Sequence, residues 1–296
     1  MENVKKKRLD WFVVFAYLVI GLFALCCVLP FLLVIMASVS SEECLLNGVT
    51  FFPQEFSGKS YLYLFQYPMK IVRAYGVSIF VTVSGTLLNM FMMLPFAYAI
   101  SKQHFVARRV LTFVMFFTVM FSGGIIPTYM VIKRFLNLFD TIWVLFVPWV
   151  VVPGHIVLLR VFFSSIPQSL FEAAELDGGS EYSQFFHMGL PLIKPGIATI
   201  AFFSVLQYWN DSYTAIIYTE NPNLVPVQVL LTQMTEYIKY IRESITSAGG
   251  TVNAADLPSQ SILFAMCVVA AGPVLVLFSF FQKYFVRGLT VGSVKG

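Results

Sequence analysis

The sequence predicts an all-α integral membrane protein with six transmembrane helices and both termini in the cytoplasm. Composition gives the class, because 58% of the 296 residues are hydrophobic and only 11% are charged, whereas soluble domains carry roughly 25% charged residues. The charged residues also stand between long uncharged stretches. Because a helix needs roughly 20 apolar residues to cross a bilayer, each stretch can supply one span.

The predicted spans follow these uncharged stretches in chain order. The first follows a basic group, as a signal peptide does, but its uncharged run is too long and lacks a small-residue cleavage site at the right distance. We therefore expect a retained helix. The whole chain, 1–296, is predicted to form one transmembrane domain, with spans at about 11–37, 76–101, 110–132, 140–160, 195–219 and 258–282.

The basic residues between the spans predict the orientation. With six spans both termini lie on one side, and that side holds 12 of the 19 lysines and arginines, against seven on the other. Positive side chains accumulate on the cytoplasmic side of a membrane. We therefore place the segment at about 161–194 in the cytoplasm and the loops at about 42–73 and 220–256 outside.

Several function classes find no support in the sequence. A net charge of +4 without a basic stripe gives no reason to expect nucleic-acid binding. No two cysteines have C-x-x-C spacing, and the three histidines (His104, His155 and His187) are too far apart in sequence for metal-ligand spacing. Neither a catalytic constellation nor the phosphate-binding pattern G-x-x-x-x-G-K-[ST] occurs. We expect no enzyme activity and no cofactor, and if ATP drives this protein, another chain binds it.

The predicted cytoplasmic segment contains a short helix. From Phe171 the sequence reads FEAAELDGGSEYSQFFHMGLPLIKPG. Pro167 and Ser169 suit a helix start, and acidic residues near the start complement the helix dipole. Gly178 and Gly179 then stop the helix. The helix is too short to be stable alone, and it carries small residues beside three acids on the cytoplasmic face.

The spacing in this segment resembles the EAA loop in permease subunits of binding-protein-dependent ABC importers. Glu-Ala-Ala is followed by three residues, a glycine, nine residues, an aliphatic residue, one further residue and Leu-Pro. Met188 departs mildly, because the family usually has isoleucine there. The resemblance implies a coupling loop, at about 168–191, whose helix sits in a cleft of a cytoplasmic ATPase. The residues implied are Glu172, Ala173, Ala174, Asp177, Gly178, Leu190 and Pro191.

The chemistry of these residues agrees with such a role. Alanine and glycine permit close approach of a partner, and Glu172 can pair with a basic residue on it. The alternative is a capped surface helix that links two spans and has no partner.

The resemblance extends over nearly the whole chain. The segments 121–132, 159–178, 208–211 and 285–296 look like carbohydrate-uptake permeases of the maltose-transporter-like group, in the polysaccharide or complex-sugar branch. One departure is Ser293, where the group usually has alanine; in that group the tail also lies against the ATPase. The resemblance implies type I ABC importer architecture in the bacterial inner membrane. It also implies a second homologous permease, a cytoplasmic ATPase dimer, an extracellular or periplasmic solute-binding protein, and an oligosaccharide as substrate.

The fifth predicted span carries polar side chains at membrane depth. Asp211 is the one acidic residue well inside a predicted span, where charge is costly unless it faces a cavity or a partner. A sugar site needs polar partners beside aromatic planes, and the predicted substrate path consists of Gln207, Trp209, Asn210 and Asp211. We place Gln207, Asn210 and Asp211 on one broad helical face. Gln207 and Asn210 are expected to bind hydroxyls, and Trp209 to pack against an adjacent span. Two alternatives remain: a cluster that holds helices together, or pairing of Asp211 within the permease dimer.

The long outer loop at about 220–256 exceeds the usual length of a connection. In maltose-type permeases the corresponding loop reaches into the binding protein, so we expect residues Ser244 to Pro258 to contact that protein. The alternative is a mobile linker.

Other functions are weighed against the importer. A permease for a non-sugar solute remains open. A secondary transporter would show inverted repeats and several buried acids, and a membrane-embedded enzyme or assembly subunit would need a catalytic cluster at one face. Neither pattern is visible in the sequence.

Overall fold

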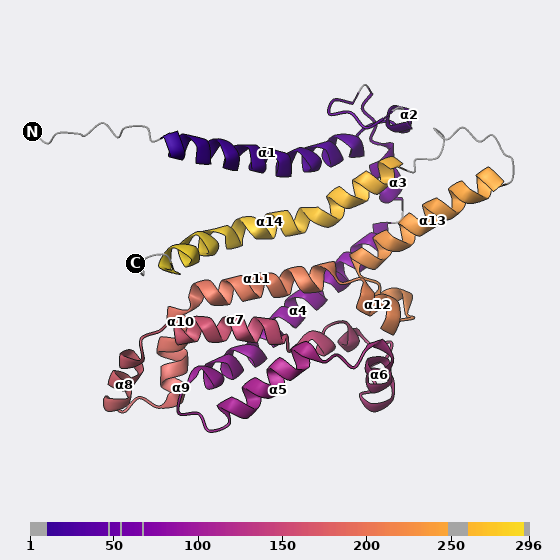
Figure 1. Cartoon of the computed structure of the whole chain (residues 1–296). Helices are drawn as coiled ribbons and strands as arrows, with labels where there is room; N and C mark the ends of the chain where they lie inside the picture. The colour runs from indigo at the N-terminus through magenta and orange to yellow at the C-terminus, as the bar shows by residue number, and fades with distance from the viewer. Residues whose placement is uncertain (1–10, 47, 54, 67, 248–259, 293–296) are drawn as a thin grey trace, which may run out of the picture. The chain divides into compact units, whose positions relative to one another are not determined.

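The computed structural model describes residues 11–46, 48–53, 55–66, 68–247 and 260–292, which form helices joined by connections (Figure 1). The all-α class predicted from the sequence is confirmed. The chain divides into two compact units, one of residues 1–68 with 235–271 and one of residues 69–234 with 272–296. Two long helices, α13 (Val227–Ser247) and α14 (Gln260–Gly292), belong partly to each unit.

In its described part, the first unit contains three helices of its own: α1 (Trp11–Ser38), α2 (Glu42–Leu46) and α3 (Lys59–Leu64). Most large apolar side chains of α1 are exposed, as expected of a helix whose neighbours are lipid or another protein. The buried Glu42 carboxylate accepts the N–H groups of Gln260 at 2.9 Å and Ser261 at 3.1 Å. Because a carboxylate satisfies free amides and complements the dipole at a helix N-terminus, Glu42 fixes the start of α14.

The second unit is built around α4 (Pro68–Ser101). Its other helices, in chain order, are α5 (Arg108–Met120), α6 (Ile125–Met130), η1 (Val131–Phe135), η2 (Ile142–Leu145), η3 (Val147–Trp149), α7 (Pro153–Ser164), α8 (Gln168–Leu176), α9 (Glu181–Ser183), η4 (Gln184–Gly189), α10 (Leu190–Leu192), α11 (Lys194–Asn210), α12 (Tyr213–Tyr218) and η5 (Pro222–Leu224). α7 lies beside both α5 and α11 (Figure 1).

Two clusters of buried side chains hold the second unit together, and α4 contributes to both. The first cluster joins the C-terminal half of α4 to α7 and α11, with Ile100 and Phe163 among its members. The second cluster joins the N-terminal half of α4 to the η2–η3 segment, α11 and α12, with Val81, Phe146 and Tyr208 among its members. α4 is therefore the element through which the two clusters are connected.

Among the described residues, three helical stretches are long and apolar enough to cross a bilayer: α1, α4 and residues 260–283 of α14. Three pairs of shorter helices pass the same test together, which gives up to six spans if each bent pair counts as one. The pairs and their bends are 108–120 with 125–135 (114°), 142–149 with 153–164 (50°), and 181–192 with 194–210 (78°). Which residues cross the membrane stays a prediction.

Three of the six predicted spans contain a break in the helix. The stretch at 110–132 breaks after Phe121, and Gly124 has a φ of 81°, which a right-handed helix does not accommodate. The stretch at 140–160 starts with 3-10 turns, and α7 begins only at Pro153, which suits a first helical position. The stretch at 195–219 stops at Asn210 and resumes at Tyr213.

The segment predicted as a long outer loop, about 220–256, is largely helical. α13 occupies 227–247 of it, with Val227 and Val229 buried while Glu236 and Lys239 form an exposed ion pair at 2.9 Å. An amphipathic helix has no long uncharged run, so the charge pattern that marks membrane spans does not reveal it. Of the predicted binding-protein contact, residues 248–258 lie outside the described residues.

Candidate functional site

α8 is the helix predicted from the Glu-Ala-Ala segment, and two backbone hydrogen bonds fix the conformation of its C-terminal end. The N–H of Gly178 donates to the carbonyl of Glu175 at 3.0 Å, and the N–H of Gly179 donates to that of Ala174 at 2.8 Å. These bonds form a Schellman motif, which satisfies carbonyls that the helix end leaves free. Gly178 has a φ of 79°, and a Cβ on Gly179 would lie 2.7 Å from the Ala174 carbonyl oxygen. Glycine is therefore favoured at Gly178 because of its conformation, and at Gly179 because a side chain has no space there.

α8 has an exposed face and an attached face. The exposed residues at its C-terminal end are Glu172, Ala173, Glu175, Leu176, Asp177 and Gly178. Leu176 is 89% exposed, although leucine is usually among the more buried residues. Phe171 and Ala174 are half-buried, and Phe171 packs against the first cluster. The helix is therefore anchored by one aromatic side chain while a small, partly apolar surface remains open.

The last two predicted coupling residues lie outside α8. Leu190 is half-buried against the first cluster, and Pro191 is exposed in α10. Both stand shortly before Lys194, where the segment turns by 78° into α11. Proline suits a first helical turn because it has no amide hydrogen to leave unsatisfied. Leu190 and Pro191 therefore belong to the joint with α11 and not to the exposed face of α8.

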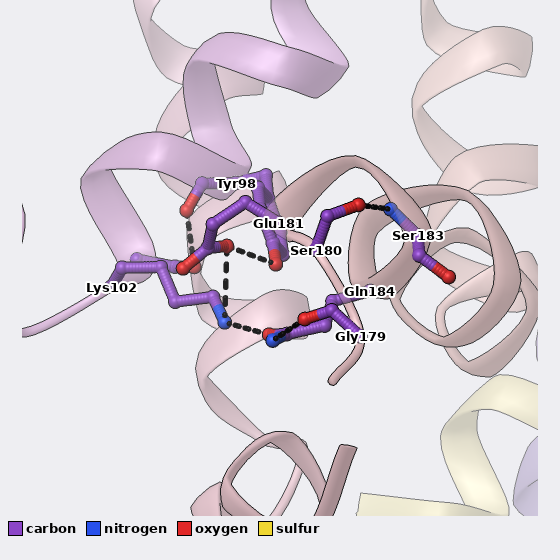
Figure 2. Close-up of polar contacts among 8 residues, drawn as sticks. Tyr98, Lys102, Gly179, Ser180, Glu181, Ser183 and Gln184 are labelled. Atoms are coloured by element: carbon purple, nitrogen blue, oxygen red, sulfur yellow. Dashed lines mark hydrogen bonds and ion pairs between the residues drawn. The ribbon is translucent and has the colours of Figure 1, made fainter. Parts of the chain in front are cut away.

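A polar cluster at the end of α4 holds the segment that follows α8 (Figure 2). The Lys102 ammonium donates to Oε1 of Gln184 at 2.9 Å and lies 3.6 Å from Oε2 of Glu181. The Tyr98 hydroxyl donates to the same carboxylate oxygen at 2.9 Å. Nε2 of Gln184 donates in turn to the carbonyl of Gly179 at 3.2 Å. We call these five residues the Lys102 cluster.

Sequence reasoning missed this cluster. It used Lys102 only as a charge that orients the spans, and it assigned Gln184 and Glu181 no role. Lys102 and Gln184 are 82 residues apart in the chain, so no local spacing reveals their contact. A lysine just after a helix C-terminus is favoured by the helix dipole in any case, so its position in the sequence does not point to a partner.

A cavity of about 870 Å³ lies between residues 98–108 and the coupling segment. Its lining includes the acidic and basic residues Lys102, His104, Arg108, Glu172, Glu175 and Glu181. Side chains of both signs therefore line one space beside α8. This lining differs from the mostly apolar, aromatic lining that a small-molecule pocket usually has, so the cavity belongs to the attachment of α8.

The predicted substrate residues are divided by the end of α11. Asn210 is the last residue of the helix and is exposed, and Gln207, one turn earlier, is half-exposed. Asp211 has left the helix, with a ψ of 104°, and its Oδ1 accepts the N–H of Thr214 at 3.0 Å. Placing Asp211 on one helical face with Gln207 and Asn210 is therefore wrong. Its carboxylate caps the first turn of α12, a frequent task for aspartate.

The aromatic pair between them is buried. Trp209 is 3% exposed and packs against Tyr75 of α4, with ring centroids 6.2 Å apart. Tyr208 is 4% exposed, its hydroxyl donates to the carbonyl of Phe146 at 3.3 Å, and its ring lies against Gly85. A Cβ on Gly85 would meet that ring at 2.7 Å. Both rings are thus used for packing inside the unit, and Trp209 offers little surface to a sugar.

A chain of hydrogen bonds fixes the start of α12 to α4. Nδ2 of the fully buried Asn89 donates to the carbonyl of Trp149 at 3.3 Å. The indole N–H of Trp149 donates to Oγ1 of Thr214 at 2.8 Å. Buried polar groups need such partners, because an unsatisfied one costs about 1–3 kcal/mol. The indole of Trp149 thus links η3 to α12.

Comparison with known proteins gives this geometry its context. Residues 71–291 match the family described as the binding-protein-dependent transport system inner membrane component. The chain belongs to this family. It is 38% identical to protein LplC of Bacillus subtilis, with 100% of this chain and 98% of LplC covered. It is 39% identical to the polygalacturonan/rhamnogalacturonan transport system permease protein YtcP of the same organism, with 98% and 100% covered.

A solved structure extends the similarity to the fold. A chain of a bacterial ABC transporter involved in the import of the acidic polysaccharide alginate superimposes with a TM-score of 0.77 and 26% identity, over 96% of this chain and 99% of that chain. The resemblance stated from the EAA spacing is thereby confirmed. The chain is an inner-membrane component with the fold of an ABC importer permease.

Proposed function

We propose that this chain is a membrane-spanning permease subunit of an ATP-driven oligosaccharide importer, coupled through α8 to a separate ATPase. The exposed face of α8 carries the proposal: the helix presents Ala173 and the 89% exposed Leu176 while Phe171 holds its other face. An open, partly apolar helix face of this kind suits a protein groove. Family membership supports the ATPase as the protein that supplies the groove.

The remaining partners follow from the same family. A second homologous permease completes the path, an ATPase dimer drives it, and a solute-binding protein on the outer side delivers the substrate. YtcP carries polygalacturonan and rhamnogalacturonan in its name, and the solved neighbour imports alginate. Similarity to such proteins over nearly the whole chain supports a saccharide of several units as the substrate.

The test is reconstitution of the complete transporter in proteoliposomes with its binding protein. Ala173→Trp places a large ring on the exposed face of α8, whereas Val106→Trp places the same ring on a residue that is 98% exposed but lies outside α8. We expect Ala173→Trp to abolish most of the ATP hydrolysis that the loaded binding protein stimulates, and Val106→Trp to leave it nearly unchanged. Equal stimulation in both variants would contradict coupling through α8.

The same preparation separates the alternative functions. Uptake that follows an imposed ion gradient without ATP would identify a secondary transporter. Stimulation by a binding protein loaded with a non-sugar solute, and by no saccharide, would leave the coupling intact and change the substrate class.

A further inference from the structure

We infer that Lys102 is a positioning residue that ties the coupling segment to α4, so that movement of α8 reaches α4 directly and not only through α11. The inference rests on the proposed function, because it takes α8 as the helix that the ATPase moves. Lys102 lies outside the EAA pattern, in the connection between α4 and α5.

Lys102 contacts both α8 and the segment that follows it, and Figure 2 shows the second of these contacts. Toward the segment after α8, its ammonium donates to Oε1 of Gln184 at 2.9 Å. Toward α8 itself, the ammonium lies 3.8 Å from the ring centroid of Phe171, close enough for a cation–π interaction. One side chain at the end of α4 thus contacts the helix and the segment that returns from it.

Gln184 carries the connection on to the end of α8. Its side chain is buried, with 4% of the residue exposed, and both ends of its amide are used. The oxygen accepts from Lys102, and the nitrogen donates to the carbonyl of Gly179, the residue that closes the Schellman motif. α8 is therefore linked to Lys102 near its start through Phe171 and at its end through Gln184.

The interactions that Lys102 makes differ in strength. The ion pair with Glu181 spans 3.6 Å, and that glutamate side chain is 70% exposed, so solvent screens most of the attraction. The hydrogen bond to Gln184 has a charged donor and a buried acceptor, which makes it the stronger kind. The Lys102 side chain is 23% exposed, so its contact with the Phe171 ring is also partly shielded from water.

α8 is joined to α7 through residues 165–167, and its Phe171 ring packs against Tyr98 of α4, with ring centroids 6.2 Å apart. Two further routes lead from α8 into the rest of the unit. The covalent route passes through α9, η4 and α10 and bends by 78° before it reaches α11. The route through Lys102 enters α4 at its C-terminal end, directly after Ser101. Because α4 contributes to both buried clusters, a displacement at this end is passed to the packing around Tyr208 as well.

The experiment measures ATP hydrolysis and sugar uptake in the same proteoliposomes, with the complete transporter and its binding protein. Lys102→Met keeps the length of the side chain and removes its charge. We expect the ATP hydrolysed per sugar imported to rise about fivefold or more, which corresponds to the loss of a typical coupling free energy. A purely structural role lowers the amount of active complex, and both rates then fall together without a change in their ratio.

Two further variants make the result specific. Lys102→Arg retains a donor for Gln184 and a cation for the Phe171 ring, so we expect a ratio close to that of the unchanged protein. Lys194→Met removes an exposed lysine at the start of α11, and we expect it to leave the ratio unchanged. If Lys102→Met does not assemble, Gln184→Met interrupts the same connection and is expected to raise the ratio.

The outcomes separate this inference from the proposed function. An unchanged ratio in Lys102→Met, or in Gln184→Met if only that variant assembles, overturns the role of Lys102, provided that Ala173→Trp still uncouples the transporter. A ratio raised equally in Lys102→Met and Lys102→Arg also overturns it. If Ala173→Trp has no effect either, the coupling role of α8 itself has failed.

Discussion

α8 and the junction between α11 and α12 are both short segments between longer helices, but they differ in how far their side chains are buried. α8 ends in a backbone motif, leaves most of its C-terminal side chains exposed, and is attached through Phe171 and the Lys102 cluster. At the junction, Tyr208, Trp209 and Thr214 are each less than 5% exposed. The difference indicates that changes at the junction should cost stability, whereas changes at α8 should cost coupling and leave the unit folded.

The largest effect is expected at Gly85. Gly85→Ala places a methyl group 2.7 to 2.9 Å from the Tyr208 ring, and overpacking of this kind costs about 1–3 kcal/mol. We expect a clear fall in the melting temperature of the purified complex in detergent. Gly76→Ala on the same helix is the control, because nothing lies within 4 Å of the added atom. Equal melting temperatures for the two variants would show that close packing of Tyr208 against Gly85 of α4 does not contribute to stability.

A smaller effect on stability, but a large one on coupling, is expected at Gly178. Its φ of 79° is unfavourable for a β-branched residue, with a cost of about 1–2 kcal/mol in the left-handed region. Because this end of α8 is exposed and can fray locally to relieve the strain, Gly178→Val should lower the stimulated ATPase rate, with a smaller fall in the melting temperature than in Gly85→Ala. Gly178→Asn should be milder, because asparagine tolerates this conformation. Melting that falls as far as in Gly85→Ala would remove the contrast between the two regions.

The exposed end of α11 should affect transport more modestly. Gln207→Ala and Asn210→Ala each remove a candidate partner of a sugar hydroxyl, and a neutral hydrogen bond contributes about 0.5–1.5 kcal/mol. We expect uptake to weaken severalfold while assembly and basal ATP hydrolysis persist. Gln233→Ala, an exposed glutamine on α13, serves as the control. Unchanged affinity and rate in both α11 variants would mean that the substrate path does not follow this helix end.

The smallest effect is expected from Asp211→Asn. Because the side-chain oxygen caps α12 through the N–H of Thr214, asparagine can make the same bond. Uptake and melting should stay close to those of the unchanged protein, whereas Asp211→Ala should lose about 1 kcal/mol of capping energy. A severe transport defect in Asp211→Asn with normal melting would assign a role to the negative charge itself.

Features that depend on neighbouring residues in the sequence could be predicted, and features that depend on distant residues could not. The start and end of α8 were predictable because Pro167 and Gly178 act on their own neighbours. The breaks after Phe121 and Asn210 were not predicted, because the spans were assigned from the spacing of charged residues, which does not show where a helix changes direction. The helix α13 was predicted as part of a loop, because it contains charged residues and no long uncharged stretch.

The candidate site shows the same limit. The exposed residues of α8 were identified from spacing, but their attachment was not, since Lys102 and Gln184 lie 82 residues apart. Asp211 was misplaced because a continuous helix was assumed, and a single extended residue moves its side chain off the expected face. The need for glycine at position 85 could not be predicted, because Tyr208 lies against it only in the folded unit.

Site-specific photo-crosslinking tests the central claim, docking of α8 to the ATPase, most directly. A photoreactive phenylalanine analogue is placed at Ala173 on the exposed face of α8, and at Phe113 on α5, which is 70% exposed, as the control. After irradiation of membranes that contain the complete transporter, a covalent adduct with the ATPase subunit is predicted from position 173 and not from position 113. The absence of an ATPase adduct from position 173, in a complex that still hydrolyses ATP on addition of loaded binding protein, would contradict the assignment of α8 as the coupling helix.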